Sequence, residues 1–219
     1  MHIKNNIKSE EAILIVGSLL LIIALTLFHY EKILEINNEI YNNIQSKIYQ
    51  ENNKNNLIVN IDVDYINETD TNIDNPPLKE QPIINYLAFL EIPKINLNQG
   101  ILPKTSYYNN VNYHVQILDI SDLPDVINGN MVLAAHSGSS NIAYFKNLYK
   151  LTKDDKAYII YNNKKYSYQV VNIYNQVKKG SLNIYRDLTK TTLTLITCTK
   201  NDKNSQTVYI LELTGVETY

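Results

Sequence analysis

The longest run of apolar residues lies near the N-terminus. Residues 12–28 read AILIVGSLLLIIALTLF without a charge, and with His29 and Tyr30 they would form a helix of about 28 Å at ~1.5 Å per residue. This length predicts a transmembrane helix over residues 12–30. The run is longer than the apolar part of an ordinary signal peptide, and no small-x-small cleavage site follows it. The pattern therefore favours an uncleaved signal-anchor over the alternative, a cleaved signal peptide.

Charges on the two sides of this span predict its orientation. Lys4 and Lys8 precede it, whereas residues 31–80 contain four lysines against ten acidic residues. The positive-inside rule then places residues 1–11 in the cytoplasm and the chain after residue 30 outside the cell.

Two kinds of pattern follow the span. Isoleucines at 33, 36, 40, 44 and 48 recur every three to four residues, which predicts that the helix continues as an amphipathic stalk. A dimerising coil is the alternative to a solvated helix, but the pattern is too short for the heptads that a coiled coil needs. Residues 51–81 are rich in Asn, Asp and Glu and lack periodicity, so residues 31–80 are predicted to be a helical stalk and a flexible tether.

Short apolar runs separated by turn residues begin near residue 81 and predict an all-β domain over 81–219. Asn162 and Asn163 stand between two such runs and suit a two-residue hairpin turn. One segment, Ile142–Leu151, has helical spacing. About eight strands with one or two short helices predict a closed barrel or a sandwich. The predicted strands are Leu87–Ile92, Val111–Leu118, Asn130–Ala135, Lys156–Tyr161, Lys164–Tyr174, Thr192–Cys198 and Thr207–Leu213.

Composition excludes several classes of protein. Twenty Lys and Arg residues against 22 Asp and Glu residues leave no basic excess for a nucleic-acid backbone. A single cysteine excludes a disulfide scaffold. One cysteine and four scattered histidines have no usual spacing for a structural zinc site, so no metal or other cofactor is predicted.

Cys198 and His136 are the candidate catalytic residues. Cys198 ends the apolar run TLTLITC, and His136 directly follows the apolar run NMVLAA, so both are expected at strand ends. A thiol becomes a competent nucleophile beside a base, and imidazole is the usual base near neutral pH. The alternative to a catalytic role is that Cys198 is a buried structural residue, which behaves as a small hydrophobic side chain. His114 lies within a strand-like run and is interpreted as an edge or exposed histidine.

The folded domain resembles the sortases, the cysteine transpeptidases that attach proteins to the cell wall of Gram-positive bacteria or join them in pili. The similar segments occur in the family's order, and TLITC together with the upstream AAHSG is a specific pair. They are FLEIPKINL (Phe89–Leu97), LPD (Leu123–Asp125), LAAHSG (Leu133–Gly138), YFKNLYKL and TLITC (Thr194–Cys198).

This resemblance implies an eight-stranded β-barrel that cleaves a C-terminal sorting motif of the LPxTG kind. Cys198 would form a thioacyl intermediate, and the acyl group would then be transferred to an amine. The implied partners are proteins that carry a sorting signal, and an acceptor such as a lipid II peptide or a pilin lysine. A Cys–His peptide hydrolase and an inactive module that binds sorting peptides remain alternatives. Calcium dependence, known for some sortases, stays open, because nothing fixes the loop carboxylates Asp154, Asp155 and Asp187 near one another.

One departure from the family concerns its arginine, which sortases carry a few residues after the cysteine. Gln206 stands at about that position here. Arg186, in the region that resembles the family's substrate-contacting loop, is one replacement for the missing guanidinium. The backbone N–H groups beside Thr197 and Cys198 are other donors for an oxyanion.

Overall fold

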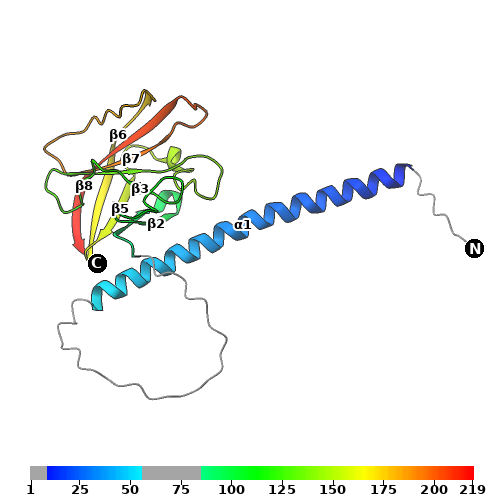
Figure 1. The fold of residues 1–219 in the computed structure, drawn as a ribbon, viewed down its shortest axis with the longest axis horizontal. Coiled ribbons are helices and arrows are strands. Elements are labelled where there is room, and N and C mark those ends of the chain that lie inside the picture. The colour runs from blue at the N-terminus through cyan, green and yellow to red at the C-terminus, as the bar shows by residue number, and fades with distance from the viewer. Residues whose placement is uncertain (1–8, 56–84) are drawn as a thin grey trace, which may run out of the picture. The chain divides into compact units, whose positions relative to one another are not determined.

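A computed structural model describes residues 9–55 and 85–219 of this protein. Contacts divide the chain into two compact units, 1–41 and 42–219. A single helix, α1, spans Ser9–Asn55 (Figure 1). The predicted tether lies largely outside the described residues.

The apolar part of α1, Ala12–Tyr30, is long enough to cross a membrane and has a mean hydropathy of 2.6. Its leucine and isoleucine side chains are exposed on every side of the helix. An exposed apolar surface of this extent requires a partner other than water. By length and composition the helix therefore qualifies as a membrane span.

Eight strands form one sheet that curls into a nearly closed barrel (Figure 1). Their order is β2-β1-β5-β6-β8-β7-β4-β3, and β4 and β7 are the parallel pair in an otherwise antiparallel sheet. The strands are β1 (Ala88–Ile92), β2 (Leu97–Ile101), β3 (Gln116–Ile117), β4 (Asn130–Ala134), β5 (Lys156–Tyr161), β6 (Lys164–Val177), β7 (Thr192–Cys198) and β8 (Ser205–Thr218). Two short 3-10 helices, η1 (Pro93–Ile95) and η2 (Leu148–Lys150), complete the domain.

Alternation along the strands separates two apolar layers. In β7, Leu193 and Leu195 point into the barrel core, whereas Ile196 packs outside it with Val132 and Val208. β7 is therefore buried on both faces up to Thr197. A strand covered on both sides is a rigid support for a side chain at its end.

The hairpin turn and most strands are where the sequence predicts them. Asn162 and Asn163 have φ of 48° and 57° and join the paired residues Tyr161 and Lys164. This is the left-handed conformation that a two-residue turn needs.

Two predicted elements are wrong. Ile142–Leu151 forms successive turns that end in η2, because its backbone bonds join residues three apart, as in Leu148 N–H to Phe145 O (3.0 Å). The predicted strand Val111–Leu118 is reduced to β3. The side chain of Asn109 takes a strand's place there, accepting the N–H of Ile117 at 2.9 Å and donating to its carbonyl at 3.0 Å.

β2 was not predicted because its centre, Asn98-Gln99-Gly100, has low strand propensity. It forms because it pairs along its full length with β1. Gly100 is required there, since a Cβ atom would lie 2.4 Å from the ring of Tyr86.

Candidate active site

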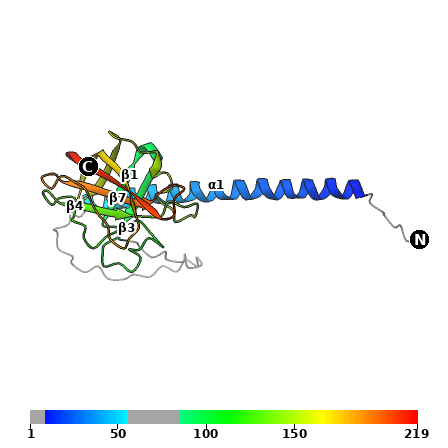
Figure 2. The same cartoon turned by 90° about the horizontal axis from the view of Figure 1, so that it is seen from above.

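The strands β4 and β7 run parallel and side by side (Figure 2). Cys198 is the last residue of β7, and His136 follows the end of β4 by two residues. Ala134 pairs with Ile196, and this register continued by two residues places His136 beside Cys198. Two bonds keep the chains together beyond the ladder. The Ala135 N–H donates to Ile196 O at 3.2 Å, and the Ser137 hydroxyl donates to Cys198 O at 2.8 Å.

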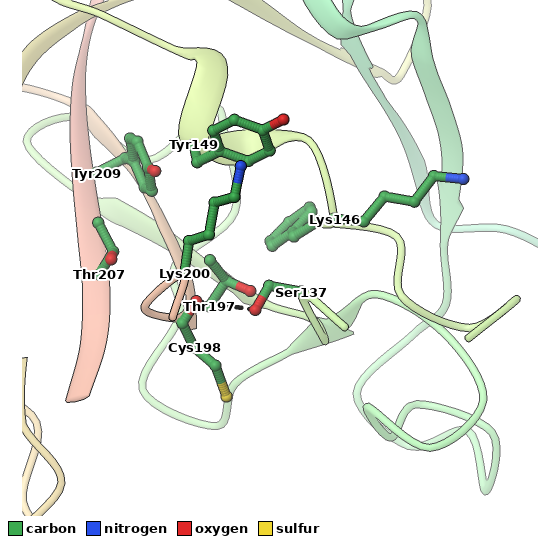
Figure 3. Close-up of a pocket in the computed structure, with 9 residues that line it drawn as sticks. Ser137, Lys146, Tyr149, Thr197, Cys198, Lys200, Thr207 and Tyr209 are labelled. Atoms are coloured by element: carbon green, nitrogen blue, oxygen red, sulfur yellow. Dashed lines mark hydrogen bonds between the residues drawn. The ribbon is translucent and has the colours of Figure 1, made fainter. Parts of the chain in front are cut away.

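Cys198 is the last residue of β7, and its thiol is half-buried and free. Because side chains alternate along a strand, it lies on the same outer face as Ile196. Thr197 faces the other way, and its buried hydroxyl donates to Ala135 O at 2.8 Å. In Figure 3 the sulfur points away from Tyr149 and from the Lys200 ammonium. This direction turns the thiol toward the outer face of the sheet.

His136 is half-buried in the loop that follows β4. Its carbonyl accepts the N–H of Phe145 at 2.9 Å, which fixes the loop against the turns that follow. Its Nε2 lies 3.4 Å from Asn112 Oδ1, which is long for a hydrogen bond.

A lysine that the sequence pattern did not single out lies against the sulfur. Lys178 Nζ is 3.1 Å from Cys198 Sγ and donates to Lys203 O at 3.0 Å. Lys178 directly follows β6, and its N–H donates to Asn204 O at 2.9 Å, just before β8. No signal in the sequence indicates this contact, because it depends on the strand order β6-β8-β7.

Gln206 lies opposite Cys198 in the β7–β8 ladder and opposite Gln176 in the β6–β8 ladder. Directly paired residues of antiparallel strands have Cβ atoms about 4.5–5.5 Å apart, so the Gln206 side chain neighbours the thiol. Among the described residues, it makes no hydrogen bond that would turn it away.

Arg186 is not brought to this site, which corrects the expectation that it replaces the family arginine. Its Nη1 donates to Asn128 O and Lys190 O, both at 3.1 Å. Those carbonyls lie beside the start of β7, and Cys198 is at its end. Six residues of strand separate Thr192 from Cys198, which is ~20 Å. The guanidinium instead fastens the 178–191 loop to the far end of the sheet.

Two hollows lie near Cys198, which itself lines the smaller one. The larger is a groove of about 360 Å³ whose walls contain more apolar than polar surface. Its lining residues are Leu118, Ala134, Lys178, Gly180, Ser181, Leu182, Ile196 and Gln206.

The smaller hollow, a cavity of about 80 Å³, is lined by Cys198 itself (Figure 3). Ser137 and Thr197 line it, together with Tyr149, over whose ring the Lys200 ammonium lies at 3.5 Å from the centroid. Tyr209 also lines it, and burial raises the pKa of that phenol to about 12, so its hydroxyl stays protonated. Within residues 9–55 and 85–219, no group of three or more His, Cys, Asp or Glu side chains is placed to hold a metal ion.

Comparisons with known proteins agree with the fold. A sequence profile of the sortase domain matches residues 90–213. Sortase A of Bacillus anthracis is 25% identical over 147 residues, 67% of this chain and 67% of that protein. A lid mutant of sortase A from Corynebacterium diphtheriae has a TM-score of 0.54 at 24% identity, covering 61% of this chain and 72% of that one.

A complex of sortase C1 from Streptococcus agalactiae with MTSET has a TM-score of 0.53 at 26% identity, covering 59% of this chain and 69% of that one. The sortase profile extends over more than half of this chain and includes β4, β7 and both candidate catalytic residues. This chain therefore belongs to the sortase family.

Proposed function

We propose that this protein is a membrane-anchored cysteine transpeptidase that cleaves a C-terminal sorting motif of the LPxTG kind and transfers the acyl group to an amine. One observation carries the proposal. The ends of two parallel strands carry His136 and a free thiol, and Lys178 and Gln206 beside that thiol line an apolar groove. The motifs that contain His136 and Cys198, LAAHSG and TLITC, resemble those that carry the family's histidine and cysteine.

The reaction has two halves. In the first, the Cys198 thiolate attacks the scissile carbonyl, a C–S bond forms, and the carbonyl oxygen becomes an oxyanion. Collapse of this intermediate breaks the C–N bond, and the imidazolium of His136 gives its proton to the departing amine. In the second half, neutral His136 takes a proton from the incoming amine as it displaces the sulfur.

The two hollows suit the two substrates. The apolar wall of the groove, which includes Leu118, Leu182 and Ile196, matches the hydrophobic residue of an LPxTG-like motif. The small cavity, which Cys198 lines, would give an acceptor amine an approach to the thioester separate from the groove. Separate approaches favour transfer over hydrolysis, because the bound donor covers one side of the thioester against water.

The proposed orientation has residues 1–11 in the cytoplasm, the span over residues 12–30, and the barrel outside the cell. Lys4 and Lys8 and the acidic composition of residues 31–80 support it. This orientation brings the site to the compartment where sorting signals and wall or pilin amines are found. The acceptor is then a lipid II peptide or a pilin lysine.

The test uses the full chain in detergent with a pool of sorting peptides and amine acceptors, including an oligoglycine and a lysine peptide. Mass spectrometry should find donor–acceptor adducts and an acyl group on Cys198. Free acid alone would indicate a Cys–His hydrolase instead. Peptide binding without any acyl-enzyme would indicate an inactive binding module.

A further inference from the structure

The site holds a positive charge that does not come from an arginine. Gln206, at about the position of the family arginine, is neutral, and Arg186 is bound to carbonyls at the other end of the sheet. Lys178 instead directs its ammonium at the sulfur of Cys198 from 3.1 Å.

Lys178 is held in this position from two sides. Its N–H is bonded to Asn204 O at 2.9 Å, which extends the β6–β8 ladder by one residue. Its ammonium is bonded to Lys203 O at 3.0 Å as well as to the sulfur. The ammonium of this exposed side chain therefore contacts both the β7–β8 loop and the thiol.

The other charged groups of this region do not duplicate this contact. Lys200 lies over the Tyr149 ring, and the sulfur of Cys198 points away from both side chains (Figure 3). Asp202 is in the β7–β8 loop, and a hydrogen bond from Ser205, together with the N–H of Asn204, holds its pKa below the ordinary value. The ionised Asp202 carboxylate adds to the attraction that keeps Lys178 in the site.

We infer that Lys178 is a catalytic residue whose ammonium is the counter-ion of the Cys198 thiolate and the charge that replaces the family arginine. This inference rests on the proposed function for its role in turnover. An ammonium favours a thiolate at hydrogen-bonding distance.

When the thiolate attacks, its charge moves to the carbonyl oxygen, which is bonded to the same carbon as the sulfur. Lys178 thus stays near the negative charge through the step. Its own proton is not transferred, since His136 supplies the proton to the leaving amine.

The first experiment measures the rate at which iodoacetamide alkylates Cys198 in the full chain in detergent, near neutral pH and at low salt. It requires no sorting peptide, so it tests Lys178 even if the proposed function fails. Lys178→Met removes the charge and keeps most of the chain length, and Lys178→Arg keeps the charge. Lys179→Met is the matched control, because it removes the same charge from an exposed neighbour that does not line the groove.

Lys178→Met should alkylate about threefold more slowly. Removal of a unit charge ~3 Å from the sulfur, in a water-like dielectric, should lower the fraction of Cys198 present as thiolate about tenfold. The more basic thiolate that remains reacts roughly threefold faster. Lys178→Arg and Lys179→Met should stay close to wild type, and high salt should narrow the difference. Equal rates for wild type and Lys178→Met, with both folded by thermal unfolding, would overturn the inference.

The second experiment measures peptide transfer. Lys178→Met should lower kcat by about 10²-fold, the size of losing one oxyanion donor, with KM changed much less. An acyl group found on Lys178 after turnover would also overturn the inference, because a neutral amine that captures the thioester is an acceptor and not a counter-ion.

Discussion

In the proposed reaction Cys198 and His136 have different tasks, so their substitutions should give different kinetic signatures. Cys198→Ala should abolish transfer with the fold intact, since sulfur is the nucleophile of the proposed reaction. His136→Ala should lower kcat by about 10²–10⁴-fold and leave the peptide Kd unchanged, because it removes proton transfer. Transfer kinetics and fluorescence binding of a labelled peptide measure both. Equal losses of binding and turnover would make His136 a structural residue.

Gln206 and Lys178 should be coupled, because both neighbour the sulfur of Cys198. In the Lys178→Met variant, Gln206→Arg should recover part of the lost transfer rate by returning a charge and a planar pair of N–H donors. In the wild type the same change should do less, since a cation is already in place. A double-mutant cycle on kcat gives the coupling. Additive effects would place the two side chains in separate roles.

His114 predicts a pH dependence of stability. It is partly buried beside Tyr86 and parallel to the ring of Tyr144, and its buried Nδ1 has no hydrogen-bond partner in the described part of the chain. Burial lowers the pKa of His114 below its ordinary 6.5. Below pH 6.5 the unfolded chain therefore binds more protons than the folded one. The contribution of the neutral His114 ring to stability is fully present above pH 6.5 and is lost as the pH falls through the folded-state pKa.

His114→Phe keeps the stacked ring and removes the titration. Tm from tyrosine fluorescence should fall less in this variant than in wild type between pH 7.5 and 5. The aspartates Asp155, Asp187 and Asp202 do not interfere, because their pKa values are lowered and they titrate in more acidic solution. If Tm falls equally in the wild type and in the variant, His114 is not the source of the pH dependence.

At the scale of elements, the site depends on how firmly the end of β7 is tied to the end of β4. The Thr197 hydroxyl makes this tie through Ala135 O and is buried. Thr197→Val has the same shape without the hydroxyl, so it should cost about 1–3 kcal/mol of the free energy of unfolding by leaving the buried carbonyl without this donor. It should also lower kcat, since His136 directly follows the loosened residue.

Urea unfolding measures the first effect, and transfer kinetics the second. Thr214→Val is the matched control, because its hydroxyl also donates to a carbonyl, that of Ser167 at 3.0 Å, but is exposed. A loss for Thr197→Val no larger than that of the control would show that the β4–β7 ladder alone fixes the site.

At the scale of the whole molecule, the proposed orientation predicts which parts an external protease reaches. In intact cells, protease should remove an epitope at the C-terminus and leave an epitope at residue 1 protected. The acidic, Asn-rich sequence before residue 81 is the expected cleavage region. Immunoblots of both epitopes measure the outcome. A barrel released into the medium, with a new N-terminus near residue 30, would mean that the span is a cleaved signal peptide.

The sequence by itself determined the apolar span, the all-β class, the hairpin at Asn162-Asn163 and the strands that end in Cys198 and before His136. These features are local, because hydrophobic periodicity and turn propensity act between residues close in the chain. The same local rules failed at Ile142–Leu151. Apolar residues three apart can be buried by a series of turns just as well as by an α-helix, and here the chain forms turns. The rules also failed at β2, where pairing with β1 overrides the low strand propensity of Asn98-Gln99-Gly100.

Only the tertiary structure decided which charges surround the thiol. Lys178 and Cys198 are twenty residues apart and meet because β8 pairs with both β6 and β7. Arg186, nearer in sequence, is held at the other end of β7 by carbonyls of its own loop and of Asn128. Strand order and register set these distances, and both depend on pairing energies spread over the whole sheet. A strand's own sequence records which of its faces is buried, but not which strands will be its neighbours.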